Sequence, residues 1–271
     1  MSATVEFPVR PSPVAAASPA RRDRIVAHIV AQMADAPVED APFQHFYLRE
    51  VFPADVYAEI VAKLPDRSSY RPLNIKRWHN DKGESTRDQL FLSEGEVDRI
   101  DASKRDLWVD ITAAMEHDDV RCAVFAKFQH DVAIRLGCRE DEVLSKPMFP
   151  SVSLVRDFKD YAIKPHPDGY PRTITMQFYL PHDETQVDLG TSLYKKLPIA
   201  YRLVGRTYDE VKRFQFLPNS AYAFAVNDCD QRQSYHGREL IGSSSGARDS
   251  MLVMWLSSPM AFASRHNSDK M

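Results

Sequence analysis

Cysteine and glycine are scarce in this chain of 271 residues. There are three cysteines, Cys122, Cys138 and Cys229, with no CxxC spacing between them. An odd number of scattered thiols does not build a disulfide framework or a zinc ribbon, so we expect each to be a small apolar residue. Only 9 residues are glycine, and neither a GxGxxG nor a GxxxxGK phosphate-binding loop occurs.

Long apolar runs are also absent. No stretch of about 18 uncharged apolar residues predicts a transmembrane helix, and the start of the chain lacks the charged and apolar regions of a signal peptide. We therefore expect a cytoplasmic protein without a membrane partner. The net charge is -3 and no basic stripe occurs, which disfavours a nucleic-acid partner. The locally basic segment "RPLNIKRW", residues 71 to 78, is expected to be a solvated loop rather than a phosphate contact.

What the chain does have is enough apolar sequence, 44% of its residues, to bury a substantial core. Residues 1 to 20 are rich in Pro, Ala and Ser and are expected to form a flexible arm. Residues 21 to 147 are expected to be mainly helical. Apolar spacing predicts one helix from Arg21 to just before Pro37, one between Pro53 and Pro65, and two between residues 94 and 137.

The pattern changes after Pro147 to short runs rich in β-branched and aromatic residues. Eight such runs predict strands: SVSLVRDF, YAIKPH, RTITMQFYL, GTSLYKK, KRFQFL, SAYAFAV, QSYHGREL and DSMLVMWLSS. Helices followed by close-spaced strands predict an α+β fold, with helices on one face of an antiparallel sandwich or jelly roll. We place this core at residues 148 to 262 and a C-terminal tail at 263 to 271, and we expect all parts of the chain to form one integrated domain.

His166 and Asp168 flank a proline between two apolar runs. In extended backbone, residues i and i+2 project to the same face, so an imidazole and a carboxylate could share one ion. His236, inside a later predicted strand, is the best third ligand, and two histidines with one carboxylate are typical of mononuclear non-haem Fe(II) oxygenases. The alternatives are a polar turn at Pro-His-Pro-Asp-Gly and a structural, buried His236.

Two further groups of polar residues are candidate site residues. Arg248 begins the last strong strand and Ser250 faces the same way; a guanidinium entering the sandwich suits a bidentate carboxylate, or else an inter-strand salt bridge with a nearby acid. His182 and Glu184 form a rival pair of metal ligands, but Pro181 ends the strand before them. We expect that second pair to lie in an exposed loop.

These motifs, in this order, resemble the iron(II)- and 2-oxoglutarate-dependent dioxygenases, particularly their prolyl-hydroxylase-like branch. The similarity spans roughly residues 150 to 258, and the segment "FYLREVFPADVYAEIVAKLP" is similar, more weakly, to the opening strand and helix of many members. The resemblance implies a double-stranded β-helix (jelly-roll) core. It also implies that His166, Asp168 and His236 ligate Fe(II), and that Arg248 and Ser250, with Tyr179, bind the distal carboxylate of 2-oxoglutarate.

The implied activity is a hydroxylation in which O2 and 2-oxoglutarate are consumed and succinate and CO2 are released. Asp168 stands where halogenating relatives have a small residue, which favours hydroxylation; desaturation and ring formation would use the same ligands. Two other functions remain open: a non-catalytic β-sandwich that binds a ligand, and a cupin-type metal enzyme that does not use 2-oxoglutarate. Arg248 and Ser250 argue against the cupin-type enzyme.

The substrate, a small molecule or a peptidyl residue, is not identified by any motif, and neither is the oligomeric state. Specificity is expected in the loops and in the helical half, and residues 65 to 95 are a possible lid. Polar residues on the strands around the expected iron site are candidates for substrate contact, although solvent-facing alternation explains them equally well: Arg156, Lys164, Arg172 and Gln177.

Overall fold

The computed structural model describes residues 16–73, 75, 78–228, 232–242 and 246–259. Cys229, the tail at 263–271 and most of the expected N-terminal arm lie outside these residues. Cys122 and Cys138 are free and partly buried. Within the described part, no helix combines the length and apolar character needed to cross a membrane.

Five α-helices come from the first half of the chain: α1 (Pro19–Asp35), α2 (Ala54–Ala62), α3 (Ala102–Met115), α4 (Asp118–Lys127) and α5 (Gln129–Leu136). The helix expected from Arg21 is α1, which begins after Ser18; the Ser18 side chain accepts a hydrogen bond from the Arg21 N–H, as an N-cap does. Its apolar stripe is buried as the spacing predicts. The last helix predicted from the sequence is divided at Phe128 into α4 and α5.

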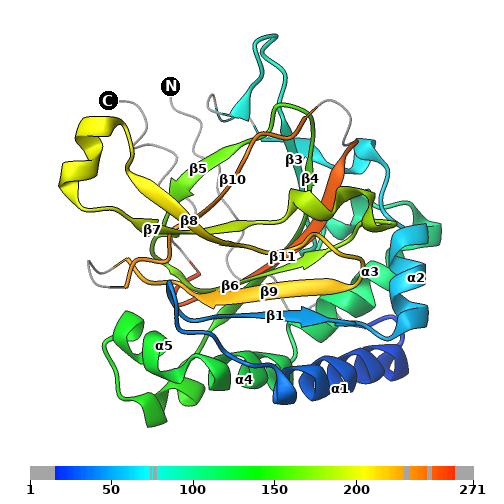
Figure 1. The fold of residues 1–271 in the computed structure, drawn as a ribbon. Coiled ribbons are helices and arrows are strands. Elements are labelled where there is room, and N and C mark those ends of the chain that lie inside the picture. Colours follow the sequence, from blue (N-terminus) through cyan, green and yellow to red (C-terminus); the bar gives the residue numbers. More distant parts are fainter. Residues whose placement is uncertain (1–15, 74, 76–77, 229–231, 243–245, 260–271) are drawn as a thin grey trace, which may run out of the picture.

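The strands form two antiparallel sheets (Figure 1). The larger has the order β1-β9-β6-β11-β4-β3-β2 and the smaller the order β5-β10-β7-β8. The strands from the first half are β1 (His45–Arg49), β2 (Arg71–Pro72) and β3 (Arg87–Phe91). Those from the second half are β4 (Phe149–Asp157), β5 (Ile163–His166), β6 (Arg172–Tyr179), β7 (Ser192–Lys196), β8 (Tyr208–Arg213), β9 (Ser220–Ala225), β10 (His236–Arg238) and β11 (Arg248–Leu256).

Strands β4 to β11 pass between the two sheets as in a jelly roll, and only the consecutive pair β7 and β8 stays in one sheet. In the larger sheet they lie in the order β9-β6-β11-β4, and in the smaller in the order β5-β10-β7-β8. The expected α+β fold with a jelly-roll core is therefore confirmed. All eight strand predictions correspond to observed strands, although β8 begins and ends four residues before the run KRFQFL. The sequence patterns did not predict β2 and β3, which extend the larger sheet beyond β4.

Both faces of the larger sheet are buried. Successive side chains along a strand point to opposite faces, so one set packs against the helices and the other packs between the two sheets. On β9, Ala221, Ala223 and Ala225 pack with the helices, and the intervening Tyr222 and Phe224 pack in a second, aromatic cluster between the sheets. Figure 1 shows α1, α4 and α5 along the side of this sheet that faces away from β5, β7, β8 and β10. On β9 the small side chains thus face the helices and the aromatic ones face the interior of the jelly roll, whereas β6 and β11 present large apolar side chains to the helices, among them Met176, Phe178 and Trp255. This arrangement places the polar residues of β4, β6 and β11 inside the sandwich.

Candidate metal site and polar cavity

His166, Asp168 and His236 come together at the end of the smaller sheet. His166 ends β5 and is the direct partner of His236 in β10. His166 Nε2 lies 3.9 Å from Asp168 Oδ1, and His236 Nε2 lies 3.8 Å from Asp168 Oδ2. One ligand atom from each residue lies within 4.8 Å of the other two. The described residues thus contain a His-Asp-His group that could hold a metal ion, formed by the three ligands expected from the sequence.

Both histidines are oriented by backbone carbonyl groups. His166 Nδ1 is 3.0 Å from the carbonyl oxygen of Lys164, and His236 Nδ1 is 3.0 Å from that of Ser234. A carbonyl oxygen can only accept, so each Nδ1 carries the hydrogen and each Nε2 presents its lone pair. This is the arrangement of metal-binding histidines, whose second nitrogen usually donates to a fixed acceptor. Burial, with His236 close by, lowers the pKa of His166 to about 4, which keeps its ring neutral at pH 7.

Asp168 is buried, and each of its two carboxylate oxygens accepts a hydrogen bond. Its Oδ1 accepts from Arg172 Nη1 and its Oδ2 from Thr175 Oγ1, both at 2.8 Å. Burial by itself raises the pKa of Asp168, but the Arg172 guanidinium and the two histidines outweigh it and hold this pKa well below its usual range. The carboxylate is therefore ionised and held in place from two sides.

Gly237 allows β5 and β10 to approach each other closely beside the paired His166 and His236. A Cβ atom added there would lie 2.7 Å from the carbonyl oxygen of Ile163 and 3.1 Å from the nitrogen of Pro165, both in the backbone of β5. Alanine can fit only if the two strands move apart.

We expect Gly237→Ala to weaken metal binding by about tenfold or more, in the range that loss of an outer-shell ligand contact costs, because it separates His166 from His236. Competition with a chelating dye measures this affinity. Gly242→Ala is the matched control, since a Cβ there would have nothing within 4 Å. Equal affinity in both variants would show that the close approach at Gly237 does not set the metal geometry.

A cavity of about 180 Å³ adjoins the His-Asp-His group. Its polar lining is unusually rich in arginine: Arg87, Arg172, Arg238 and Arg248. Trp78, Tyr161, Ile163, Leu252 and Met254 supply most of the apolar lining. The cavity therefore joins a possible metal site to a strongly basic interior.

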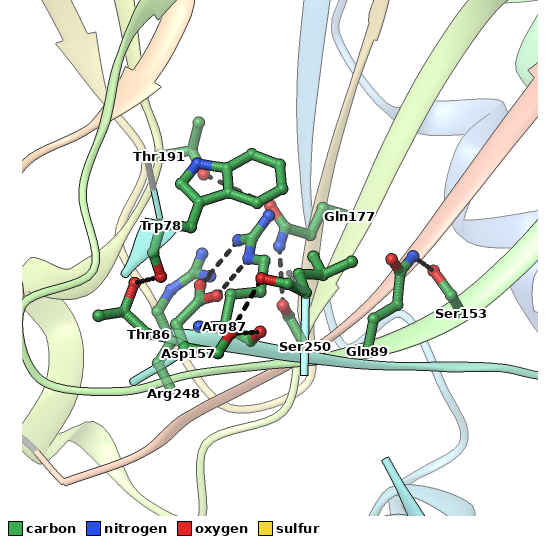
Figure 2. Close-up of polar contacts among 12 residues, drawn as sticks. Trp78, Thr86, Arg87, Gln89, Ser153, Asp157, Gln177, Thr191, Arg248 and Ser250 are labelled. Atoms are coloured by element: carbon green, nitrogen blue, oxygen red, sulfur yellow. Dashed lines mark hydrogen bonds and ion pairs between the residues drawn. The ribbon is translucent and has the colours of Figure 1, made fainter. Parts of the chain in front are cut away.

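Asp157 is the buried acid beneath this cavity. Its Oδ1 accepts from Arg87 Nε at 2.5 Å, and its Oδ2 accepts from Arg87 Nη2 and Arg248 Nη1, both at 2.9 Å. Figure 2 shows the two guanidinium groups converging on Asp157, with Trp78 above them. Burial opposes ionisation of Asp157, but Arg87 and Arg248 keep its pKa below the usual range. One carboxylate thus neutralises two arginines only in part.

Three donor atoms around this cavity have no hydrogen-bond partner in the described part of the protein. They are Arg248 Nη2, Arg238 Nε and the hydroxyl of Tyr161, and all three are buried. Burial and the nearby Arg248 lower the pKa of Arg238 to about 10. Buried donors are normally satisfied, so these atoms indicate that the cavity is built to receive an acceptor, and the surrounding charge favours an anion.

Of the three residues expected to bind 2-oxoglutarate, only Arg248 lines the cavity. Arg248 lines the cavity, and its Nη1 makes the inter-strand salt bridge that was the alternative interpretation of this residue. Ser250 Oγ accepts from Gln177 Nε2 at 2.7 Å (Figure 2). The hydroxyl oxygen of Tyr179 accepts from the Thr191 N–H at 2.9 Å. Neither Ser250 nor Tyr179 is among the residues lining the cavity, and both support the residues that do line it, Gln177 and Thr191.

The candidate substrate-contact residues also differ in whether they line the cavity. Arg172 and Gln177 line the cavity, but Arg156 and Lys164 do not; Arg156 pairs with Asp249 at 2.6 Å. His182 is 85% exposed, which confirms the expected loop. Within residues 65 to 95, the possible lid, the structure places β2 and β3 in the larger sheet and Trp78 in the cavity lining. In the segment 71 to 78, which was expected to be a solvated loop, Arg71 is exposed and pairs with Glu96, but Arg71 and Pro72 form β2; residues 74, 76 and 77 lie outside the described residues.

Several residues of the cavity were missed from the sequence. Arg238 is at i+2 from His236 in a strand, so the alternation used for Asp168 and Ser250 predicts that it faces the same interior. Asp157 lies near the end of a predicted strand, but its pairing with Arg248 depends on the register between β4 and β11, which the sequence alone does not give. Arg87 and Trp78 carried no usable signal, because β3 was not predicted and its pairing with β4 depends on the tertiary fold.

Comparisons with known proteins give structural similarities only. The chain matches no protein-family model, and no curated protein is significantly similar in sequence. Similar structures include a Pseudomonas putida prolyl-4-hydroxylase, at 13% identity and a TM-score of 0.48, covering 86% of this chain and 98% of that one. A prolyl hydroxylase from Trichoplax adhaerens, in complex with a peptide fragment of hypoxia inducible factor, is similar at 9% identity and a TM-score of 0.46. The match covers 88% of this chain and 91% of that one.

HygX from Streptomyces hygroscopicus, whose structure has nickel and 2-oxoglutarate bound, is similar at 10% identity and a TM-score of 0.44, covering 78% of this chain and 82% of that one. At these identities and TM-scores the similarities carry no conclusion about activity. The jelly-roll assignment rests on the strand order itself, and the metal site and cavity rest on the contacts of this chain.

Proposed function

We propose that this protein is an Fe(II)- and 2-oxoglutarate-dependent oxygenase that hydroxylates an unactivated C–H bond of a small molecule or peptidyl residue. The observation that carries the proposal is the junction of the His-Asp-His group with a cavity whose buried arginine donors lack partners. A metal ligand set and an anion-binding interior are the two parts that such a reaction needs. The sequence resemblance to this family supports the same function.

The donor set fits a divalent iron. His166 and His236 would bind through Nε2, since each Nδ1 donates to a carbonyl group, and Asp168 would bind through a carboxylate oxygen. Two imidazoles and one carboxylate leave coordination positions open. Arg172 and Thr175 would keep the carboxylate in one orientation.

The cavity fits a dicarboxylate. Arg248 and Arg238 would hold the distal carboxylate of 2-oxoglutarate, with the Tyr161 hydroxyl as a third donor. Arg248 is fixed for this role by Asp157 on one side and by the carbonyl oxygen of Leu189 on the other, 2.8 Å from its Nε. A preorganised guanidinium loses little conformational entropy when it binds an anion. Ser250 and Tyr179 would act indirectly, through their contacts with Gln177 and Thr191.

Bound iron would supply the redox chemistry that couples conversion of 2-oxoglutarate and O2 into succinate and CO2 to insertion of the second oxygen atom into the substrate C–H bond. The chain's own residues would bind and orient the metal and 2-oxoglutarate. The apolar side chains of Trp78, Ile163 and Leu252 in the lining limit the access of water to the reacting atoms. This division of roles predicts separate effects for metal-site and arginine variants.

We expect Arg248→Gln to lower the affinity of the Ni(II)-loaded protein for 2-oxoglutarate by about 10- to 100-fold. A charge-assisted hydrogen bond contributes about 1.5–3 kcal/mol, and about 1.4 kcal/mol corresponds to a factor of ten. Isothermal titration calorimetry measures the change, and Arg248→Lys, which keeps the charge, should retain part of the affinity. Arg156→Gln is the control, because Arg156 pairs with Asp249 away from the cavity. No binding by folded, metal-loaded wild-type protein would contradict the proposed function.

A further inference from the structure

The connection between β7 and β8 carries large apolar side chains on its outside. It contains a short 3-10 helix, η6 (Ile199–Val204), which Figure 1 shows in yellow beyond the outer ends of both strands. We call residues 195 to 209 the η6 tip. Within it, Leu203 is 91% exposed, Ile199 76% and Tyr201 45%. Exposed apolar side chains that gather on one segment indicate a surface of contact.

Backbone hydrogen bonds give the η6 tip a defined shape. The Leu197 N–H donates to the carbonyl oxygen of Thr207 at 2.9 Å, which continues the pairing of β7 with β8 by one step. The Tyr201 N–H donates to the carbonyl oxygen of Pro198 at 3.0 Å, and the Arg206 N–H donates to that of Tyr201 at 3.1 Å. The apolar side chains are therefore displayed on a preformed projection.

The η6 tip is basic as well as apolar. Residues 195 to 209 contain four basic residues and one acidic residue. The acidic residue, Asp209, forms an ion pair with Arg206. Lys195 and Lys196, at the end of β7, are exposed. The tip thus presents positive charge next to its apolar side chains.

This combination selects among classes of partner. Basic side chains attract any anionic surface, including a nucleic acid, but the aliphatic Ile199 and Leu203 gain nothing from contact with phosphate groups. The tip of a second copy would be repelled by its own positive charge. An anionic bilayer satisfies both features, because its headgroups attract lysine and arginine and its interface accepts apolar side chains. Tyrosine is also favoured at that interface.

We propose that the η6 tip binds the surface of an anionic lipid bilayer. Ile199, Tyr201 and Leu203 enter the boundary between headgroups and acyl chains, and Lys195 and Lys196 contact the headgroups. The expectation of no membrane partner rests on the lack of an apolar run that could span a bilayer, and binding at the interface needs no such run. The proposal involves neither the metal nor 2-oxoglutarate, so it goes beyond the proposed function and does not depend on it.

The η6 tip lies at the metal end of the smaller sheet. In β7, Leu193 is the direct partner of His236, and the strand continues to Lys196, about 10 Å further at about 3.3 Å per residue. Strand β10 runs the opposite way from His236 and leads to Leu240, which is 64% exposed. Binding through the tip would hold the end with the His-Asp-His group nearer to the bilayer than the end with Leu240.

The test is sedimentation of the full-length protein with vesicles of phosphatidylcholine, either alone or with about 30% phosphatidylglycerol. We expect binding to the anionic vesicles to be at least about tenfold tighter and to weaken as salt is added. Leu203→Asp should weaken it by about tenfold or more, and so should Lys195→Glu combined with Lys196→Glu. Leu240→Asp is the matched control, since it changes an exposed leucine outside the tip, and it should bind as the wild type does.

Fluorescence distinguishes insertion from adsorption by charge alone. Tyr201→Trp places an indole in the η6 tip, and the parent protein, which has three tryptophans, gives the signal to be subtracted. We expect the difference emission to shift to shorter wavelength on anionic vesicles, because the indole leaves water. Vesicle binding without this shift would contradict the insertion of the apolar side chains.

Three further results would overturn the inference: equal binding to both kinds of vesicle, unchanged binding of Leu203→Asp, or unchanged binding of the double lysine variant. Circular dichroism shows whether each variant is folded. Light scattering tests the rival partner, a second copy of this chain. A wild-type dimer that Leu203→Asp converts to a monomer, together with no vesicle binding, would assign the tip to self-association and contradict the proposal.

Discussion

Replacing His236 by alanine is expected to lower the affinity for Fe(II) by more than about 100-fold, which exceeds the 10- to 100-fold cost of losing an outer-shell contact. His236 Nε2 faces Asp168 at 3.8 Å and its Nδ1 is fixed by the Ser234 carbonyl group, so no nearby side chain of the site replaces it. Metal content after anaerobic dialysis and competition with a chelating dye measure the effect.

Two variants calibrate this result. Thr175→Val removes the hydroxyl that donates to Asp168 Oδ2 without removing a ligand, and we expect an intermediate loss of about 10- to 100-fold. His182→Ala removes a histidine that is 85% exposed, and the affinity should not change. Equal metal content in His236→Ala and His182→Ala would exclude the His-Asp-His group as the metal site.

Asp157→Asn is expected to destabilise the ligand-free protein by about 3–5 kcal/mol, the cost of removing one partner from a buried ion pair. Asp157 is fully buried and accepts hydrogen bonds from both Arg87 and Arg248. The amide keeps the shape but leaves these two guanidinium groups, with Arg238 nearby, without a neutralising charge. Chemical denaturation monitored by fluorescence or circular dichroism gives the free energy of unfolding.

Asp55→Asn is the control for this measurement. Asp55 forms an exposed ion pair with Arg24, and such pairs contribute little to stability. Under the proposed function, 2-oxoglutarate should also stabilise Asp157→Asn more than it stabilises the wild type, because the variant has more uncompensated positive charge. A variant as stable as the wild type would show that Asp157 does not neutralise the arginine cluster.

The fold was predictable to a large extent because its signals are local. The strand runs after Pro147 and the stripe Ile25, Val26, Ile29 and Met33 follow directly from alternation and helical spacing, and both were confirmed. The strands β2 and β3 were not predicted. Their stretches are short and polar, with Asp88 and Gln89 within β3, and their pairing is set by β4, about sixty residues later in the chain.

The site was predictable where alternation along one strand decides it. His166, Asp168 and His236 come together because β5 and β10 are direct neighbours; His236 was expected there because it lies in a predicted strand and because of the family resemblance. The arginine cluster required the register between β3, β4 and β11, in which both Arg87 and Arg248 are opposite Asp157. No single stretch of sequence contains that register, so the role of Asp157 could not be predicted from the sequence.

The most direct test of the central claim is to add 2-oxoglutarate to anaerobic, Fe(II)-loaded protein and record the visible absorption spectrum. We predict a weak charge-transfer band of the chelated oxo-acid, absent in His166→Ala and weakened in Arg248→Gln. Admission of O2 should then release succinate, even without substrate, at a slow rate. A folded, iron-loaded wild-type protein that shows no band would contradict the oxygenase assignment and favour a ligand-binding protein or a metal enzyme that does not use 2-oxoglutarate.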